Sequence, residues 1–235
     1  FEPGVYSDSG LPVEFVGHPF VAADYLPPVK YDPAGPVLLL PGSRRGAVAR
    51  IFPALLAGFR AAGEPREAVV LYPSDEIRRT LHAANPPANV RLVRLAENPT
   101  PVAGASNAEA RGAILPVASS AVLTSSGTMS MHCALAGIPG AIVYRIDPLT
   151  YVLGRLLVRV KFLGIANILL DEAMYPEYIQ GAATPGALAA EVRACLEDPA
   201  RRTRTAEQAE RLRNLLIKPT GGSAARWLLR ELNGG

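Results

Sequence analysis

The sequence predicts an α/β domain: a Rossmann-like, doubly wound parallel sheet followed by C-terminal helices. Short, continuous apolar runs recur along the chain, as is typical of strands buried on both faces. Helix-like stretches alternate with these runs, which indicates parallel strands joined by helical crossovers. Turns rich in glycine and serine follow two of the runs, at the strand ends where such sheets bind ligands.

The first half of the predicted sheet begins at Val37. Its turn after the first strand reads Pro41-Gly42-Ser43-Arg44-Arg45-Gly46. A polar loop follows the third strand and leads to a further helix. The expected strands are 37–40, 68–71 and 90–95, and the expected helices are 47–62, 75–82 and 107–117.

The second half is centred on a small-residue turn, Ser125-Ser126-Gly127-Thr128, between strand 121–124 and a helix. The helical pattern stops at Gly137, Pro139 follows, and residues 141–144 form the next expected strand. Backbone N–H groups at a helix N-terminus, with hydroxyls beside them, suit an anion such as phosphate. Strand, turn, helix and strand together predict half of a nucleotide-binding unit.

The C-terminal stretch 184–233 is predicted to be helical. Thr184 followed by Pro185 is a favourable helix start, and residues 218–222 break the pattern before a last helix around Trp227. We expect residues 1–24 to end a preceding domain and form a linker, 25–218 to form the main domain, and 219–235 to form a C-terminal helix. The chain does not begin with Met, which predicts a missing N-terminal portion.

Composition narrows the class of protein. The net charge of +3 is too small to indicate nucleic-acid binding, and 49% apolar residues suffice for a substantial core. Cys133 and Cys195 lie in apolar, helix-like settings that favour buried free thiols. No signal peptide is visible, and no apolar run reaches the roughly 20 residues that span a bilayer. The three histidines suggest no metal site.

The turn at 41–46 offers a hydroxyl and two guanidinium groups, whose forks match phosphate oxygens. The alternative is an ordinary turn with solvated arginines, because the spacing fits neither a P-loop nor GxGxxG. Arg145, just after strand 141–144, should point into the same crevice unless it is a plain surface arginine. For His132 the alternative to ligand binding is a packed helix residue.

Residues 148–162, PLTYVLGRLLVRVKF, are apolar with interspersed basic residues. We interpret them as a packed helix whose basic side chains reach water, rather than a patch that touches an anionic membrane surface.

Together, several motifs resemble the lipid-A-disaccharide synthase family of GT-B glycosyltransferases. These motifs are FVGHP (15–19), LLLPGSR (38–44), SGT (126–128), YR..PLTY (144–151), RLLVRV (155–160), Asn167 and PE..Q (176–180). The resemblance implies transfer of 2,3-diacylglucosamine from its UDP conjugate to 2,3-diacylglucosamine 1-phosphate, with release of UDP. It implies no metal or organic cofactor, and a cytoplasmic protein peripheral to the inner membrane.

The resemblance also makes this chain the donor-binding half of the enzyme, the C-terminal domain of a GT-B fold. The catalytic residues and the acceptor site would lie in an absent N-terminal domain, so the chain alone is expected to be inactive. Its partners would be the UDP-diacylglucosamine donor, the lipid acceptor, that domain and the inner membrane. The implied donor-binding residues are Gly42, Ser43, Arg44, Ser126, Gly127, Thr128, His132, Tyr144, Arg145, Asn167, Glu177 and Gln180.

Three positions depart from the resemblance. Ala47, His132 and Ala173 stand where the family usually carries Glu, which suggests a divergent branch whose sugar, acyl groups or activity differ. Two alternatives therefore stay open. The first is another GT-B enzyme, such as a UDP-N-acetylglucosamine epimerase, and the second is a non-catalytic homologue that binds a nucleotide sugar or a partner domain.

Overall fold

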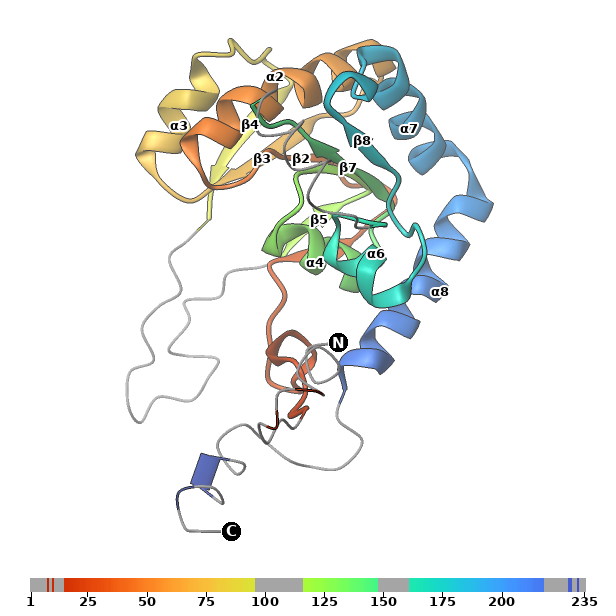
Figure 1. Ribbon diagram of the computed structural model, residues 1–235. Helices are drawn as coiled ribbons and strands as arrows, with labels where there is room; N and C mark the ends of the chain where they lie inside the picture. The colour runs from red at the N-terminus through yellow and green to blue at the C-terminus, as the bar shows by residue number, and fades with distance from the viewer. Residues whose placement is uncertain are drawn as a thin grey trace.

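A single parallel sheet of six strands, in the order β4-β3-β2-β6-β7-β8, forms the centre of the molecule (Figure 1). The computed structural model describes residues 8, 10, 15–95, 116–147, 161–217, 228, 229 and 232. Numbered along the chain, the strand order is 3-2-1-4-5-6, the doubly wound arrangement, which confirms the predicted fold class. The strands are β2 (Val37–Leu40), β3 (Ala68–Tyr72), β4 (Val90–Arg94), β6 (Ala121–Thr124), β7 (Gly140–Tyr144) and β8 (Glu177–Ile179).

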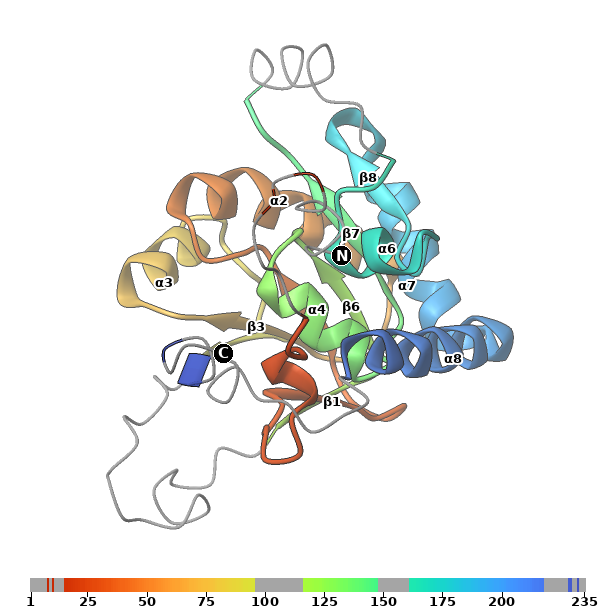
Figure 2. The same ribbon diagram turned by 60° about the horizontal axis from the view of Figure 1, so that its bottom comes forward.

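Helices cover both faces of this sheet (Figures 1 and 2). One face packs against α2 (Arg45–Ala62), α3 (Asp75–His82) and α7 (Pro185–Glu197). The other face packs against α4 (Thr128–Leu135), α6 (Ile165–Leu170) and α8 (Pro199–Leu216). Two short 3-10 turns, η1 (Pro19–Val21) and η2 (Gln180–Ala182), complete the regular structure that we use below.

The two-sided core explains the apolar runs in the sequence. Within β2, Val37 and Leu39 face the α2 side while Leu38 and Leu40 face the α4 side, and all four are buried. Gly58 lets α2 approach α7 closely, because a Cβ at that position would lie 2.4 Å from the Cβ of Leu188. Burial on both faces therefore requires uninterrupted apolar strands and a small residue at the helix crossing.

Three short strands were not predicted. β1 (Val29–Tyr31) and β5 (Val117–Ser119) form a separate parallel pair, and β8 closes one edge of the main sheet. Each has three residues, too few to show a period in the sequence. The predicted helix 107–117 is wrong at Val117, which begins β5, and residues 107–115 of that prediction lie outside the described residues.

Other predictions also fall on residues that the structure does not describe. The packed helix expected within 148–162 lies outside the described residues except for Lys161 and Phe162, which are not helical. Of the helix expected around Trp227, only residues 228, 229 and 232 are described, and they are helical. The domain boundaries after residues 24 and 218 stay predictions. Within the described ranges, no helix combines the length and the apolar character needed to cross a membrane.

Candidate functional site

The strand order reverses between β2 and β6, and the chain turns to opposite faces after these two strands. β2 leads into α2 on one face, and β6 leads into α4 on the other. Ser125, directly after β6, donates its N–H to the carbonyl of Leu40 at the end of β2, at 2.8 Å. Ligands of doubly wound sheets bind at this point, where the loops diverge and leave a crevice.

Gly42 brings the two turns into contact. Its φ of +105° lies in the region that favours glycine, and an added Cβ would lie 3.1 Å from the Oγ of Ser125. Glycine at this position therefore serves both the backbone conformation and the close approach. Ser43 and Arg44 follow it and are exposed, so the predicted phosphate turn presents its polar side chains to solvent.

The two helices that start at this point have no side-chain cap. α2 begins after Arg44, which makes no capping hydrogen bond, and α4 begins after Gly127, which has no side chain. By contrast, the N-caps of α3, α7 and α8 accept N–H groups on their side chains, namely those of Ser74, Thr184 and Asp198. No N-cap side chain therefore accepts a first-turn N–H group of α2 or α4, although in α4 the N–H of Ser130 donates to the carbonyl of Gly127 at 2.9 Å. Helix starts of this kind can donate to solvent or to a bound anion.

The predicted serines and threonine of the second turn surround the start of α4. Ser126 and Gly127 are half-buried, and Thr128 is exposed at the first helical position. Ser130, one turn later, donates its hydroxyl to the carbonyl of Gly127 at 2.6 Å and so holds the turn. The structure therefore brings together six predicted residues, which we call the switch-point cluster: Gly42, Ser43, Arg44, Ser126, Gly127 and Thr128.

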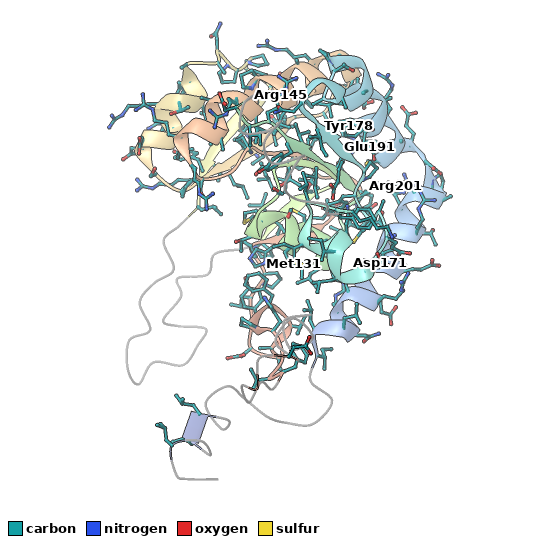
Figure 3. The ribbon with its side chains drawn as sticks, viewed as in Figure 1. Met131, Arg145, Asp171, Tyr178, Glu191 and Arg201 are labelled. Atoms are coloured by element: carbon teal, nitrogen blue, oxygen red, sulfur yellow. The ribbon has the colours of Figure 1, made fainter. Side chains whose placement is uncertain are left out.

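Arg145 adds a positive charge at the end of β7, the strand next to β6 (Figure 3). Its Nη2 donates to the carbonyl of Ala183 at 2.8 Å, while its Nε is buried and has no partner among the described residues. A buried donor without an acceptor is costly, and more so on a charged group. The arginine is therefore suited to an anionic ligand at the carboxyl edge of the sheet.

Tyr144 and Gln180 lie at the same corner. Tyr144 is half-buried and pairs in register with Ile179, the residue before Gln180. The side-chain amide of Gln180 donates to the carbonyl of Ile146 at 3.0 Å. The corner thus joins the ends of β7 and β8 beside Arg145.

Asn167 and Glu177 serve the protein's own backbone. Asn167 is fully buried and exchanges two hydrogen bonds with the backbone of Tyr175, at 2.7 and 2.9 Å. The Glu177 carboxylate accepts the N–H of Leu163, the N–H of Gly164 and the Asn167 amide, all within 3.0 Å. It caps α6 from another strand, and direct contact of either residue with a ligand stays a prediction.

His132 follows Thr128 of the switch-point cluster by four residues, one helical turn along α4. It is buried on the second turn of α4, with its ring centroid 4.0 Å from that of Phe20 and its ring plane parallel to that of Tyr25. Burial, reinforced by the nearby His18, lowers the pKa of His132 to about 4, so the imidazole is neutral at pH 7. The structure favours the packed alternative, and short sequence signals gave no hint of this aromatic contact.

The structure places the three departures from the resemblance on three different segments of the chain. Ala47 lies in the first turn of α2 near the switch point, whereas His132 belongs to the aromatic contact just described. Ala173 follows α6 and precedes β8, and its neighbour Glu172 pairs with Arg211 of α8. Ala47 and His132 thus follow switch-point residues along α2 and α4, whereas Ala173 lies in the loop between α6 and β8.

A second buried polar cluster lies at the opposite end of β7 (Figure 3). Arg201 donates to the carbonyl of Gly140, the first residue of β7, at 2.8 Å and pairs with Glu191 at 3.0 Å. Tyr178 donates its hydroxyl to the same carboxylate at 3.2 Å. This cluster ties α7 and α8 to the sheet and is a structural feature that the sequence motifs did not indicate.

The two cysteine thiols and the possible metal ligands do not form a further site among the described residues. Cys133 and Cys195 are free and buried, as expected, and burial raises the pKa of each thiol to about 12. Among the residues that the structure describes, no three His, Cys, Asp or Glu side chains gather in a way that could hold a metal ion.

Comparison with known proteins gives a consistent family. A family model described as lipid-A-disaccharide synthetase matches residues 1–227. The chain is 34% identical over 240 residues to a lipid-A-disaccharide synthase of Geobacter metallireducens, covering 96% of this chain and 58% of the relative. It is 33% identical over 242 residues to that of Syntrophus aciditrophicus, with the same two coverages of 96% and 58%. The chain thus spans less than two thirds of these relatives.

Solved structures are more distant. The calicheamicin glycosyltransferase CalG4 is similar with a TM-score of 0.49 and 17% identity, over 89% of this chain and 44% of that one. WaaG, a glycosyltransferase involved in lipopolysaccharide biosynthesis, is similar with a TM-score of 0.44 and 14% identity, over 86% of this chain and 48% of that one. Likeness at this level carries no argument about activity.

Proposed function

This chain belongs to the lipid-A-disaccharide synthetase family, and from that membership we propose that it binds the UDP-sugar donor of a lipid A glycosyltransferase. The reaction is transfer of 2,3-diacylglucosamine from UDP to 2,3-diacylglucosamine 1-phosphate. The chain supplies the donor side, and the acceptor site and catalytic base belong to a preceding domain of the longer protein. The proposed setting is the cytoplasmic side of the inner membrane, with peripheral membrane contact.

One observation carries the donor-binding proposal. Two helix N-termini without side-chain caps meet at the strand-order reversal, where Gly42 touches Ser125. Each N-terminus offers N–H groups and a positive dipole end, which favour a diphosphate between them. Arg145 adds a positive charge at the end of the neighbouring strand β7, held in place by the carbonyl of Ala183.

The same groups suit the chemistry of transfer. As the bond from the sugar to the diphosphate breaks, negative charge grows on the departing UDP. Fixed N–H donors and a guanidinium stabilise that charge without having to reorganise, which lowers the barrier. We assign Arg44 and the first turns of α2 and α4 to this role, with Ser43, Ser126 and Thr128 as hydroxyl donors.

Titration of the 235-residue chain with UDP tests the proposal. We expect measurable binding, at least about 10-fold weaker binding for Arg44→Ala, and much weaker binding of uridine, because charge-assisted contacts to phosphate dominate. Arg79→Ala, an exposed arginine of α3 away from the switch point, is the matched control and should bind like the unchanged chain. Absence of both binding heat and thermal stabilisation by UDP would refute donor binding.

A non-catalytic homologue is the second candidate, and the packed His132 favours it. Where relatives are expected to present Glu toward a ligand, this chain uses the position to hold Phe20 and Tyr25. The two candidates predict the same UDP binding but different turnover. A transfer assay on the longer protein with UDP-diacylglucosamine and the lipid acceptor separates them, because only the enzyme releases UDP.

A further inference from the structure

We propose that Gln180 is a positioning residue that acts on the bound diphosphate through Arg145 and does not itself touch the ligand. The inference rests on the proposed function, in which Arg145 faces the diphosphate. It is carried by a reciprocal pair of hydrogen bonds between the ends of β7 and β8. Each strand end donates from a side chain to a backbone carbonyl of the other.

The geometry of this pair is specific. From the β8 end, Gln180 Nε2 donates to the carbonyl of Ile146 at 3.0 Å. From the β7 end, Arg145 Nη2 donates to the carbonyl of Ala183 at 2.8 Å. Ala183 in turn donates its N–H to the carbonyl of Gln180 at 3.2 Å. Gln180 therefore holds both the residue after Arg145 and the residue that Arg145 binds.

The backbone of Gln180 indicates that this corner is held under constraint. Its φ of 51° lies in the left-handed region, which is uncommon for a residue with a side chain and costs free energy. One N–H of its side-chain amide donates to Ile146, which orients the side chain toward the end of β7. A strained residue that fixes its neighbours is typical of a support for a site.

The consequence falls on Arg145. With Nη2 fixed on Ala183, the guanidinium is held at the carboxyl edge of the sheet and cannot swing freely to water. Loss of the Gln180 side chain removes the hydrogen bond that holds Ile146. Part of the binding free energy of UDP must then be spent on ordering Arg145. Pre-organisation of this kind changes affinity without adding a contact.

The test is a double-mutant cycle on UDP affinity in the 235-residue chain. Gln180→Gly removes the side chain while glycine accepts the φ of 51° without strain, so the fold is retained. Gln180→Asn, which also tolerates this conformation, is the second variant should the glycine variant prove unstable. Asn85→Gly is the matched control, because Asn85 also has a positive φ, of 49°, but lies after α3.

We expect Gln180→Gly to weaken UDP binding about 10-fold and Arg145→Ala to weaken it more, with the double variant no weaker than Arg145→Ala. Uridine binding and the Asn85→Gly control should not change. Additive losses would mean that Gln180 contacts the ligand directly and would overturn the inference, as would an unchanged affinity in Gln180→Gly. If the unchanged chain fails to bind UDP, the proposed function itself has failed. If the unchanged chain binds UDP and Arg145→Ala binds it with the same affinity, donor binding stands and the inference is overturned.

Discussion

Arg145 and Arg201 lie at opposite ends of β7, and their hydrogen-bond and ion-pair partners differ (Figure 3). Arg201, at the amino end, pairs with the buried Glu191 carboxylate, and a tyrosine hydroxyl donates to the same carboxylate. Arg145, at the carboxyl end, has a backbone carbonyl for one nitrogen and no carboxylate partner in the described part of the chain. The charge of Arg201 is balanced by a carboxylate and serves the fold. Arg145 has no such partner among the described residues, so we expect an anion to bind there.

The largest effect on the free energy of unfolding is expected from removing the charge that balances Arg201 at the amino end of β7. Glu191→Gln removes the negative charge beside Arg201 while keeping the side-chain shape. The remaining buried guanidinium then has no carboxylate to balance its charge, and we expect the free energy of unfolding to fall by about 3–5 kcal/mol. Chemical denaturation measures this loss.

The exposed pair between Glu172 and Arg211 provides the control for that experiment. Glu172→Gln should cost less than about 1 kcal/mol, because solvent screens a pair whose side chains are 39% and 56% exposed. Equal losses for the two variants would contradict the distinction between a buried, balanced charge and a surface one.

A smaller effect is expected from pH, through His132. Its pKa falls from 6.5 to about 4 in the folded chain, so below pH 6.5 the unfolded chain takes up a proton that the folded chain does not. Stability should therefore decline as pH falls from 6.5 to about 4, by up to about 3 kcal/mol, and level off below. Thermal unfolding of the unchanged chain and of His132→Phe across this range measures it, and parallel curves for the two proteins would contradict the assignment.

The smallest effects are expected at the helix N-termini, where α3 has a side-chain cap and α2 has none. Ser74→Ala removes the cap of α3 and should cost about 1 kcal/mol without changing UDP affinity. Arg44→Ser places a cap residue at α2 and should stabilise the chain by a similar amount while weakening UDP binding. Denaturation and titration on the same samples check both, and a stability loss in Arg44→Ser would argue that α2 is not open.

The predictable parts of the molecule are those fixed by local pattern. β2 and β6 are buried on both faces, so their apolar runs were readable, and Gly42 and Gly127 marked the turns that follow. β1, β5 and β8 were missed because three residues carry no period, and each exists through its neighbour in a sheet. The Gln180 and Arg145 hydrogen bonds join residues 34 and 38 positions apart and could not be inferred from spacing.

The resemblance supplied what local pattern could not. It singled out Asn167, Glu177 and Gln180, although it could not separate residues that face a ligand from those that support them. For His132 it predicted a ligand contact that the structure does not favour, because a neighbouring aromatic segment occupies that side of α4. Family motifs thus locate a site, while burial and hydrogen bonds assign the roles within it.

β8 and the residue that follows it hold the chain on both sides of residues 148–160. Gln180 holds Ile146 where the chain leaves the sheet, and Glu177 holds Leu163 and Gly164 where it returns. The ends are therefore fixed independently of whatever sequence runs between Asp147 and Lys161. One short segment at the edge of the sheet thus fixes both the exit of the chain from β7 and its entry into α6.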